Sequence, residues 1–509
     1  MDDFLTLGRY CFGFMICVEL MTLTSLICMV CMVYIGASPN IASCGNVTFV
    51  DQKEACERLP ILLETTKCEP QLEYQFLSVN VEYNLLCKDA HLVKNSISVQ
   101  MFGVLVGAFF FGQLSDSYGR KLTILISLFC ISVTSLINAY VPSFAYFYWV
   151  RVLVGFFTGG LSTAMGVYMI ENIPKKHRMW ISTVITWSPN FIVFPIIAYF
   201  CHDWRSLLKA NAVCAMLSAL SLCFLFESPR FLIQKGRVEE ARRVFSKIRR
   251  IDGDSKHRYN HEELEEMLKH EQMAIENRAK KQRKYTYYHI LCTWEMLAWT
   301  ATLAFGIGAT SLTNYGLMFN MEKLSGSLYW NNVWLGIIRW SMNISVAIGD
   351  YFCERFGRKP INVLALVFNG SCLVWICWTY YQGTQSDGGW VLRSCTIGIT
   401  AMCSQLYLAK FMACNELYPT AVRNLAVSNL SIWSRIGTMA APQLFQLSDI
   451  SSSLPYVILL VFTLLDLAAF EIFIPETKGN ALTNNLPPKE QRIFYQNKKR
   501  RQSLVTEAI

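Results

Sequence analysis

Charge is scarce in this chain, and so are the residue patterns that catalysis needs. Asp, Glu, Lys and Arg make up 16% of its 509 residues, and only seven residues are histidine; an average globular protein carries about 25% charged residues. No spacing of cysteine and histidine predicts a metal site. No nucleophile paired with a base and no phosphate-binding loop appears either. These absences predict a protein that is not an enzyme and needs no cofactor.

Apolar residues dominate instead. They form 53% of the chain, and the mean hydropathy is +0.30. About 20 apolar residues span a bilayer as a helix, which satisfies its own backbone hydrogen bonds in lipid. The sequence therefore predicts an all-α membrane protein with twelve transmembrane helices. They are expected at 10–35, 96–115, 122–141, 144–169, 179–201, 205–226, 291–319, 328–353, 361–381, 391–413, 424–447 and 454–474.

Three motifs occur twice, about half a chain apart. The first is Asp116 with Gly119-Arg120-Lys121 and Glu354 with Gly357-Arg358-Lys359; the second is Glu171, Pro174 and Arg178 with Glu416, Pro419 and Arg423; the third is Glu227-Ser228-Pro229-Arg230 with Pro475-Glu476-Thr477-Lys478-Gly479. Internal repetition in an apolar chain is typical of transporters that rock two bundles about a central site.

The repeats predict the domain organisation. Residues 1–227 and 291–480 are expected to form two six-helix bundles, with a linker of short amphipathic helices at 228–290 and a tail at 481–509. Lys and Arg concentrate in loops that are cytoplasmic if the N-terminus is inside, so both termini are predicted to be cytoplasmic. The net charge of +9 is attributed to this anchoring at the lipid bilayer, and no nucleic-acid partner is predicted. The first apolar segment follows an acidic start without a cleavage pattern, so we expect it to be retained.

One long loop, 36–95, is expected on the outer side. It holds Cys44, Cys56, Cys68 and Cys87, and the glycosylation sequon at Asn46. An outer loop meets oxidising conditions during synthesis, so two disulfides are predicted, with three connectivities open. Free thiols and an unused sequon are the alternative.

The motifs resemble those of a known group. Gly112-x-Leu114-x-Asp116-x-x-Gly119-Arg120-Lys121 and Arg151-x-x-x-Gly155 are similar to motifs of the major facilitator superfamily. The long first loop, Glu227-Ser228-Pro229-Arg230-Phe231-Leu232, Asn314-Tyr315-Gly316-Leu317, Glu416-Leu417-Tyr418-Pro419-Thr420-x-x-Arg423-Asn424 and Pro475-Glu476-Thr477-Lys478-Gly479 together resemble its organic cation, anion and carnitine transporter family. The resemblance covers residues 3–480 and implies alternating-access transport of small organic ions in a plasma membrane. Ser117 departs from it, because the family usually carries a basic residue there.

The loop charges of these motifs are candidates for a gate. An acid at one helix end and a base on the next can pin two elements in one state and release them in another. Topology signalling by positive charge is the alternative. The candidate gating residues are Asp116, Arg120, Lys121, Arg151, Glu171, Arg178, Glu354, Arg358, Glu416, Arg423 and Glu476.

Arg435 is the leading candidate for substrate binding. It lies eleven residues into the helix expected from Asn424, roughly 16 Å deep in a hydrocarbon layer about 30 Å thick. A charge at that depth is expensive unless it faces water or a partner. By resemblance, cation carriers have an aspartate here and anion and carnitine carriers an arginine. The expected substrate is therefore an organic anion or a carboxylate-bearing zwitterion; pairing with a protein acid is the alternative.

Four further residues are substrate-binding candidates, namely Arg339, Glu19, Tyr315 and Trp433. Glu19 could recognise an amine, which leaves an organic cation carrier open; a sugar porter and a non-transporting sensor also remain. Asp466 is expected to pack or pair without a substrate role. Lys410 and Glu295 are expected to extend to the membrane interface.

Overall fold

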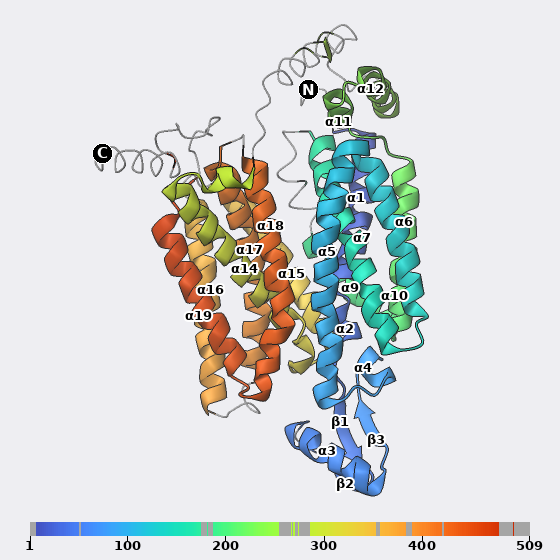
Figure 1. Cartoon of the computed structure of the whole chain (residues 1–509), viewed down its shortest axis with the longest axis vertical. Helices are drawn as coiled ribbons and strands as arrows, with labels where there is room; N and C mark the ends of the chain where they lie inside the picture. Colours follow the sequence, from blue (N-terminus) through green and yellow to red (C-terminus); the bar gives the residue numbers. More distant parts are fainter. Residues whose placement is uncertain are drawn as a thin grey trace, which may run out of the picture. The chain divides into compact units, whose positions relative to one another are not determined.

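The computed structural model describes residues 7–49, 52–174, 181, 187–253, 266, 268–269, 273, 286–352, 357–382, 389–419, 422–477 and 492. It divides into two compact units (Figure 1). The first contains Met1–Gln282 and Phe319–Trp340, and the second contains Arg283–Met318 and Ser341–Ile509.

Long helices build both units. Those of the first are α1 (Arg9–Val30), continued by α2 (Met32–Ile35), then α5 (Ala90–Tyr118), α6 (Arg120–Ala139), α7 (Phe144–Asn172), α9 (Trp187–Cys201) and α10 (Trp204–Cys223). Those of the second are α14 (Trp294–Met318), α16 (Arg358–Gln382), α17 (Gly389–Leu417), α18 (Arg423–Gln446) and α19 (Leu454–Phe473). Helix α15 (Leu328–Phe352) contributes its first half to the first unit and its second half to the second.

Every predicted membrane segment contains a helix. Among the described residues, nine helices are long and apolar enough to cross a membrane. The other three predicted segments hold α9, of which 15 residues are described, and α15 and α18, which carry more polar residues. The helix ends differ from the prediction: α5 begins at Ala90 and α17 continues to Leu417. Hydropathy marks only the apolar part of a helix, whereas its backbone hydrogen bonds continue into polar flanks.

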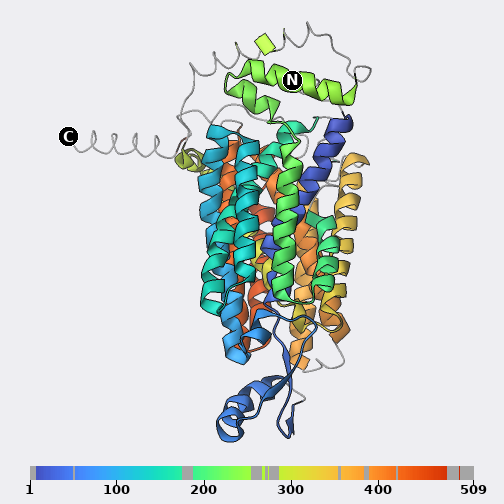
Figure 2. The ribbon, with the colours of Figure 1, turned by 90° about the vertical axis from the view of Figure 1, so that its right-hand side faces the viewer.

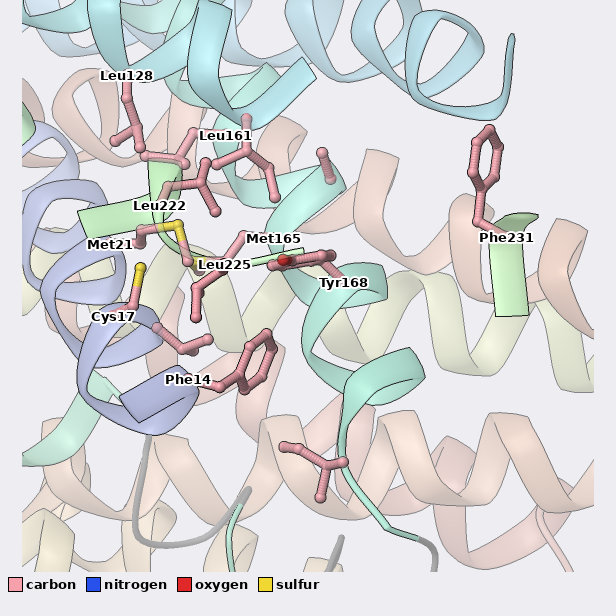
Figure 3. Packing of buried hydrophobic residues seen from close by; sticks show 14 of the residues in the cluster. Phe14, Cys17, Met21, Leu128, Leu161, Met165, Tyr168, Leu222, Leu225 and Phe231 are labelled. Atoms are coloured by element: carbon pink, nitrogen blue, oxygen red, sulfur yellow. The ribbon is translucent and has the colours of Figure 1, made fainter. Parts of the chain in front are cut away.

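The core of the first unit lies where α1, α6, α7 and α10 meet. Figure 3 shows Phe14, Cys17 and Met21 of α1 beside Leu161 and Met165 of α7. Helices α5 and α7 approach closely at small residues: a side chain added at Gly155 would place its Cβ 2.1 Å from the carbonyl oxygen of Gln100. Glycine at this contact therefore permits the two backbones to touch.

A small lobe follows α2 in the first unit. Strands β1 (Asn40–Cys44), β2 (Val47–Thr48) and β3 (Pro70–Glu73) form an antiparallel sheet in the order β2-β1-β3, and α3 (Gln52–Thr66) packs on it. Short helices α4 (Val79–Glu82) and η2 (Cys87–Asp89) lead back to α5. Disulfides join Cys44 to Cys68 and Cys56 to Cys87. The two predicted disulfides are thus present, and the structure selects one of the three connectivities.

Two helices from the linker cap the other end of this unit. Figure 2 shows α11 (Pro229–Gln234) and α12 (Val238–Asp252) at the end of the bundle opposite the lobe. Helix α12 is amphipathic, with Ala241, Phe245 and Ile248 buried. Its last residue, Asp252, accepts a hydrogen bond of 2.8 Å from the backbone N–H of Tyr10 and so holds the start of α1.

The second unit packs α14 against α18. A Cβ added at Gly437 would lie 2.2 Å from the carbonyl oxygen of Gly308, so the two backbones are in contact there. Short 3-10 turns η5 (Tyr287–Leu291) and η7 (Leu447–Asp449) precede α14 and follow α18, while η6 (Met321–Lys323) belongs to the first unit. The buried side chains of Leu303, Ile307 and Leu430 fill this interface.

Candidate functional site

A carboxylate caps the start of α6. The Glu227 side chain accepts hydrogen bonds from the backbone N–H groups of Arg120 and Lys121 at 3.1–3.2 Å. Gly119, just before the helix, has φ of 121°, and an added Cβ would lie 2.4 Å from Glu227 Oε2. Free N–H groups and the helix dipole favour a negative charge at this position.

The second unit repeats the arrangement at α16. Glu476 accepts hydrogen bonds from the backbone N–H groups of Arg358 (2.9 Å) and Lys359 (3.1 Å). A Cβ added at Gly357 would lie 2.2 Å from Glu476 Oε2. The two glycines are therefore required by the same contact in both halves, which explains why Gly-Arg-Lys and a later glutamate repeat together.

The arginine at each helix start also reaches a second acid. Arg120 donates to Asp116 (2.7 Å) and Glu171 (3.3 Å). Arg358 Nε donates to Glu416 at 3.3 Å, and the hydroxyl of Thr477 donates to the same carboxylate. In each unit, the arginine of the first repeated motif thus binds the glutamate of the second.

The lysines of the motif point to carbonyl groups. Lys121 Nζ donates to the carbonyl oxygen of Leu225 at 2.6 Å, and Lys359 Nζ donates to that of Glu471 at 2.8 Å. The Leu225 carbonyl lies two residues after α10, and the Glu471 carbonyl lies in the last turn of α19. Each lysine is therefore near the C-terminal end of a helix, where the dipole favours a positive charge.

Other gating candidates lie elsewhere. Arg423 donates to the carbonyl oxygen of Tyr418 at 3.4 Å and binds no acid among the described residues. Arg151 is buried in α7, where it donates to Gln100 and to Cys31 Sγ, with its guanidinium 5.6 Å from the Phe147 ring centre. It is thus separate from the Arg120 network. Arg178 and Glu354 lie outside the described residues.

Glu227 was not among the predicted candidates, although its motif was recognised as a repeat. Its correspondence to Glu476 was the signal that could have identified it. Burial raises the pKa of the Glu227 carboxyl, while the N–H groups of Ser228, Lys121 and Arg120 act in the opposite direction. These hydrogen bonds therefore stabilise the carboxylate and partly offset the free-energy cost of removing it from water.

Arg435 lies on a polar face of α18. This face carries, at helical spacing, Asn424, Ser428, Ser431, Arg435 and Gln443. On another face, Ser434 forms a 2.9 Å hydrogen bond with Ser311 of α14. The Arg435 side chain is half-buried and has no hydrogen bond or ion pair within the part of the chain that the structure describes. The alternative of a protein acid as its partner therefore finds no support in these residues.

The remaining substrate candidates fall into both units. In the first, the amide of Asn190 on α9 donates to Glu19 Oε1 at 2.8 Å, and the Arg339 guanidinium lies 5.1 Å from the ring centre of Phe191. Glu19 and Arg339 thus contact consecutive residues of α9. In the second, Tyr315 is buried in α14, and Trp433 is exposed on α18.

The prediction for Lys410 is wrong. Its side chain is fully buried and binds Asp466 Oδ2 at 2.5 Å. Depth along one helix placed it near the interface, but a partner on α19 keeps it inside the unit. The expected pairing of Asp466 is confirmed, and Glu295 is exposed at the start of α14.

Comparison with known proteins gives consistent matches. The family described as "Sugar (and other) transporter" matches residues 48–485. Organic cation/carnitine transporter 2 of Homo sapiens is 28% identical over 83% of this chain and 74% of its own length. The organic cation transporter protein of Drosophila melanogaster is 27% identical over 81% of this chain and 74% of its own. The inward open structure of the xylose transporter XylE from E. coli aligns with a TM-score of 0.64 and 16% identity, covering 93% of this chain and 98% of that one. At this identity the structural likeness establishes the fold.

Proposed function

Because the chain belongs to the sugar (and other) transporter family, we propose that it carries small organic ions across a membrane by alternating access. The resemblance to organic cation, anion and carnitine transporters and the major facilitator fold are confirmed. The protein is a transporter and not an enzyme. Relatives named for organic cations and carnitine support an organic ion over a sugar as substrate.

The preferred substrate is an organic anion or a carboxylate-bearing zwitterion. Arg435 carries this proposal, since its guanidinium lies deep along α18 without a protein partner among the described residues. An isolated charge at that depth is stable only beside water or a ligand of opposite charge. A guanidinium offers a planar pair of donors that matches a carboxylate. Arg339 would add positive charge in the first unit, and Tyr315 and Trp433 would contribute aromatic surface.

A direct test is uptake by Arg435→Asp. Cells expressing wild type or the variant would be given a labelled aromatic carboxylate, labelled carnitine, a labelled quaternary ammonium ion and a labelled hexose. We expect the variant to lose at least tenfold in carboxylate uptake, because removing a charged hydrogen-bond partner costs about 2 kcal/mol or more. Arg393→Asp is the matched control, because Arg393 is another half-buried arginine without a partner in the described residues.

The outcomes separate the alternatives. An unchanged ratio of anion to cation uptake in Arg435→Asp would remove Arg435 as the selector. Transport of the quaternary ammonium ion alone would indicate an organic cation carrier that uses Glu19, and transport of hexose would indicate a sugar porter. Binding without flux in proteoliposomes would indicate a sensor.

The Arg120 and Arg358 networks are proposed to gate the cycle. Each joins a helix start to acids on two other segments. Such bonds can form in one state and break in the other without new covalent chemistry. We further propose that the protein lies in a plasma membrane, with the disulfide-bonded lobe on the extracellular side and both termini in the cytoplasm. Asn46, at an exposed turn of the lobe, would then be glycosylated.

A further inference from the structure

Glu19 is a half-buried acid without a charged partner among the described residues. Its Oε1 accepts the 2.8 Å hydrogen bond from Asn190, while its Oε2 is buried and has no hydrogen-bond partner among the described residues. Asp466, a buried acid of the second unit, has Lys410 at 2.5 Å. The two carboxyl groups therefore differ: Asp466 has an ion-pair partner, and Glu19 has none among the described residues.

The depth of Glu19 makes its charge expensive. Helix α1 begins at Arg9, so Glu19 lies about 15 Å along the helix, close to the middle of a hydrocarbon layer about 30 Å thick. A carboxylate there with a single neutral donor would be strongly destabilised. A protonated carboxyl carries no charge and still accepts the amide hydrogen bond through its carbonyl oxygen.

Among the described residues, no ion pair to Glu19 comes from the helices that pack against α1. Helices α7, α9, α10 and α12 pack against α1. Ionisable side chains on them reach other positions of α1 or its end: Arg151 at Cys31, just after α1, Tyr168 at the ring of Phe14, and Asp252 at Tyr10. On α15, Arg339 reaches α9 at Phe191, but within the described residues it makes no ion pair with Glu19. Cys17 of α1 contacts Ser221 of α10.

We propose that Glu19 is a proton-binding site that couples transport to protons. In the described conformation, the carboxyl is protonated and hydrogen-bonded by Asn190. When the cycle opens this region to water, the O–H bond breaks, the proton passes to a water molecule, and the carboxylate remains. Return to the buried conformation takes the proton back from water. This adds proton coupling to the proposed transport, and the state of Glu19 can be measured without any substrate.

The first test is spectroscopic. Infrared spectra of the purified full-length protein in lipid at pH 7 should contain the carbonyl-stretch band of a protonated carboxylic acid that Glu19→Gln lacks. Glu295→Gln is the control, since Glu295 is exposed and should not contribute. Glu19→Asp should retain a protonated band. Equal spectra of wild type and Glu19→Gln would overturn the proposal even if the protein transports organic ions.

The second test measures coupling. Proteoliposomes at zero membrane potential would be given labelled carnitine or the labelled carboxylate, with and without a pH difference. For one proton per substrate, the accumulation ratio of the wild type should change about tenfold per pH unit. In Glu19→Gln, the pH difference should no longer alter the accumulation ratio, whatever flux the variant retains. If the accumulation ratio in Glu19→Gln still responds to the pH difference as in the wild type, proton coupling at this site is contradicted. If there is no flux at all but the infrared band is present, only the proposed function is contradicted.

Discussion

Lys410 shows how one buried charge can be fully satisfied inside a helix bundle. Its ammonium has three N–H donors, and they bind Asp466, the carbonyl oxygen of Gly306 at 2.8 Å and the hydroxyl of Thr310 at 2.8 Å. The site also needs a small residue, because a Cβ at Gly306 would lie 2.3 Å from Asp466 Oδ1. The ion pair thereby fixes α14, α17 and α19 to one another.

Breaking this pair on one side should be worse than removing it altogether. Lys410→Met leaves the Asp466 carboxyl buried without its partner, which costs about 3–5 kcal/mol. In the double variant Lys410→Met/Asp466→Leu, no charge remains to be buried, so most of that stability should return. Thermal unfolding of purified protein in detergent measures both. If the double variant unfolds as early as the single one, the ion pair is not what stabilises this contact.

The residue scale also shows the limit of reading depth from one helix. Arg435 and Lys410 both carry charge inside predicted membrane segments, but the sequence does not say which of them has a partner. The structure gives Lys410 an acid on α19 and leaves Arg435 without one among the described residues. Which side chains pair between helices distant in sequence depends on how the helices pack, and a hydropathy profile does not specify that packing.

At the scale of the element, the start of α6 depends on a single glycine. Gly119 has the positive φ that disfavours other residues, and the Glu227 carboxylate occupies the place of a side chain. The cap therefore requires glycine for two independent reasons, one in the backbone and one in the packing.

Gly119→Ala is expected to destabilise the first unit by more than 1 kcal/mol, since it combines backbone strain with displacement of the capping carboxylate. Gly166→Ala is the matched control, because Gly166 is inside α7 and has open space where its Cβ would be. That change should be neutral or stabilise by about 0.5–1 kcal/mol. Denaturant unfolding in detergent compares the two, and equal effects would argue against the cap.

Most elements could be predicted, but their contacts could not. Long apolar runs predicted each membrane helix because lipid requires internal hydrogen bonding. The repeats predicted that Arg120 and Arg358 would have equivalent roles, and the structure gives both a glutamate from the second motif. The capping role of Glu227 and the separate position of Arg151 depend on how helix ends meet in space. Motif spacing along the chain does not specify that geometry.

At the scale of the whole molecule, the first unit includes a segment from far along the chain. Residues Phe319–Trp340, which follow α14 and include the first half of α15, belong to this unit. Lys94 at the start of α5 binds Glu322 at 2.5 Å and Asn320 at 2.8 Å, and all three side chains are largely buried. In the same region, Gln75 of the lobe accepts a 2.7 Å hydrogen bond from the backbone N–H of Leu328. If the proposed cycle separates residues 319–340 from the rest of the first unit, these contacts must break.

Joining Lys94 and Glu322 covalently should therefore stop transport. In the double variant Lys94→Cys/Glu322→Cys, oxidation is expected to reduce labelled carnitine or carboxylate uptake at least tenfold, and a mild reductant should restore it. Wild type treated in the same way is the control, because the disulfides Cys44–Cys68 and Cys56–Cys87 meet the same reductant. The charge reversal Lys94→Glu should release the contact, and the double variant Lys94→Glu/Glu322→Lys should restore it. The measure is the labelling of Asn320→Cys by a water-soluble maleimide, which should rise in the first variant and fall again in the second. Full uptake by the cross-linked protein would show that this contact does not have to open.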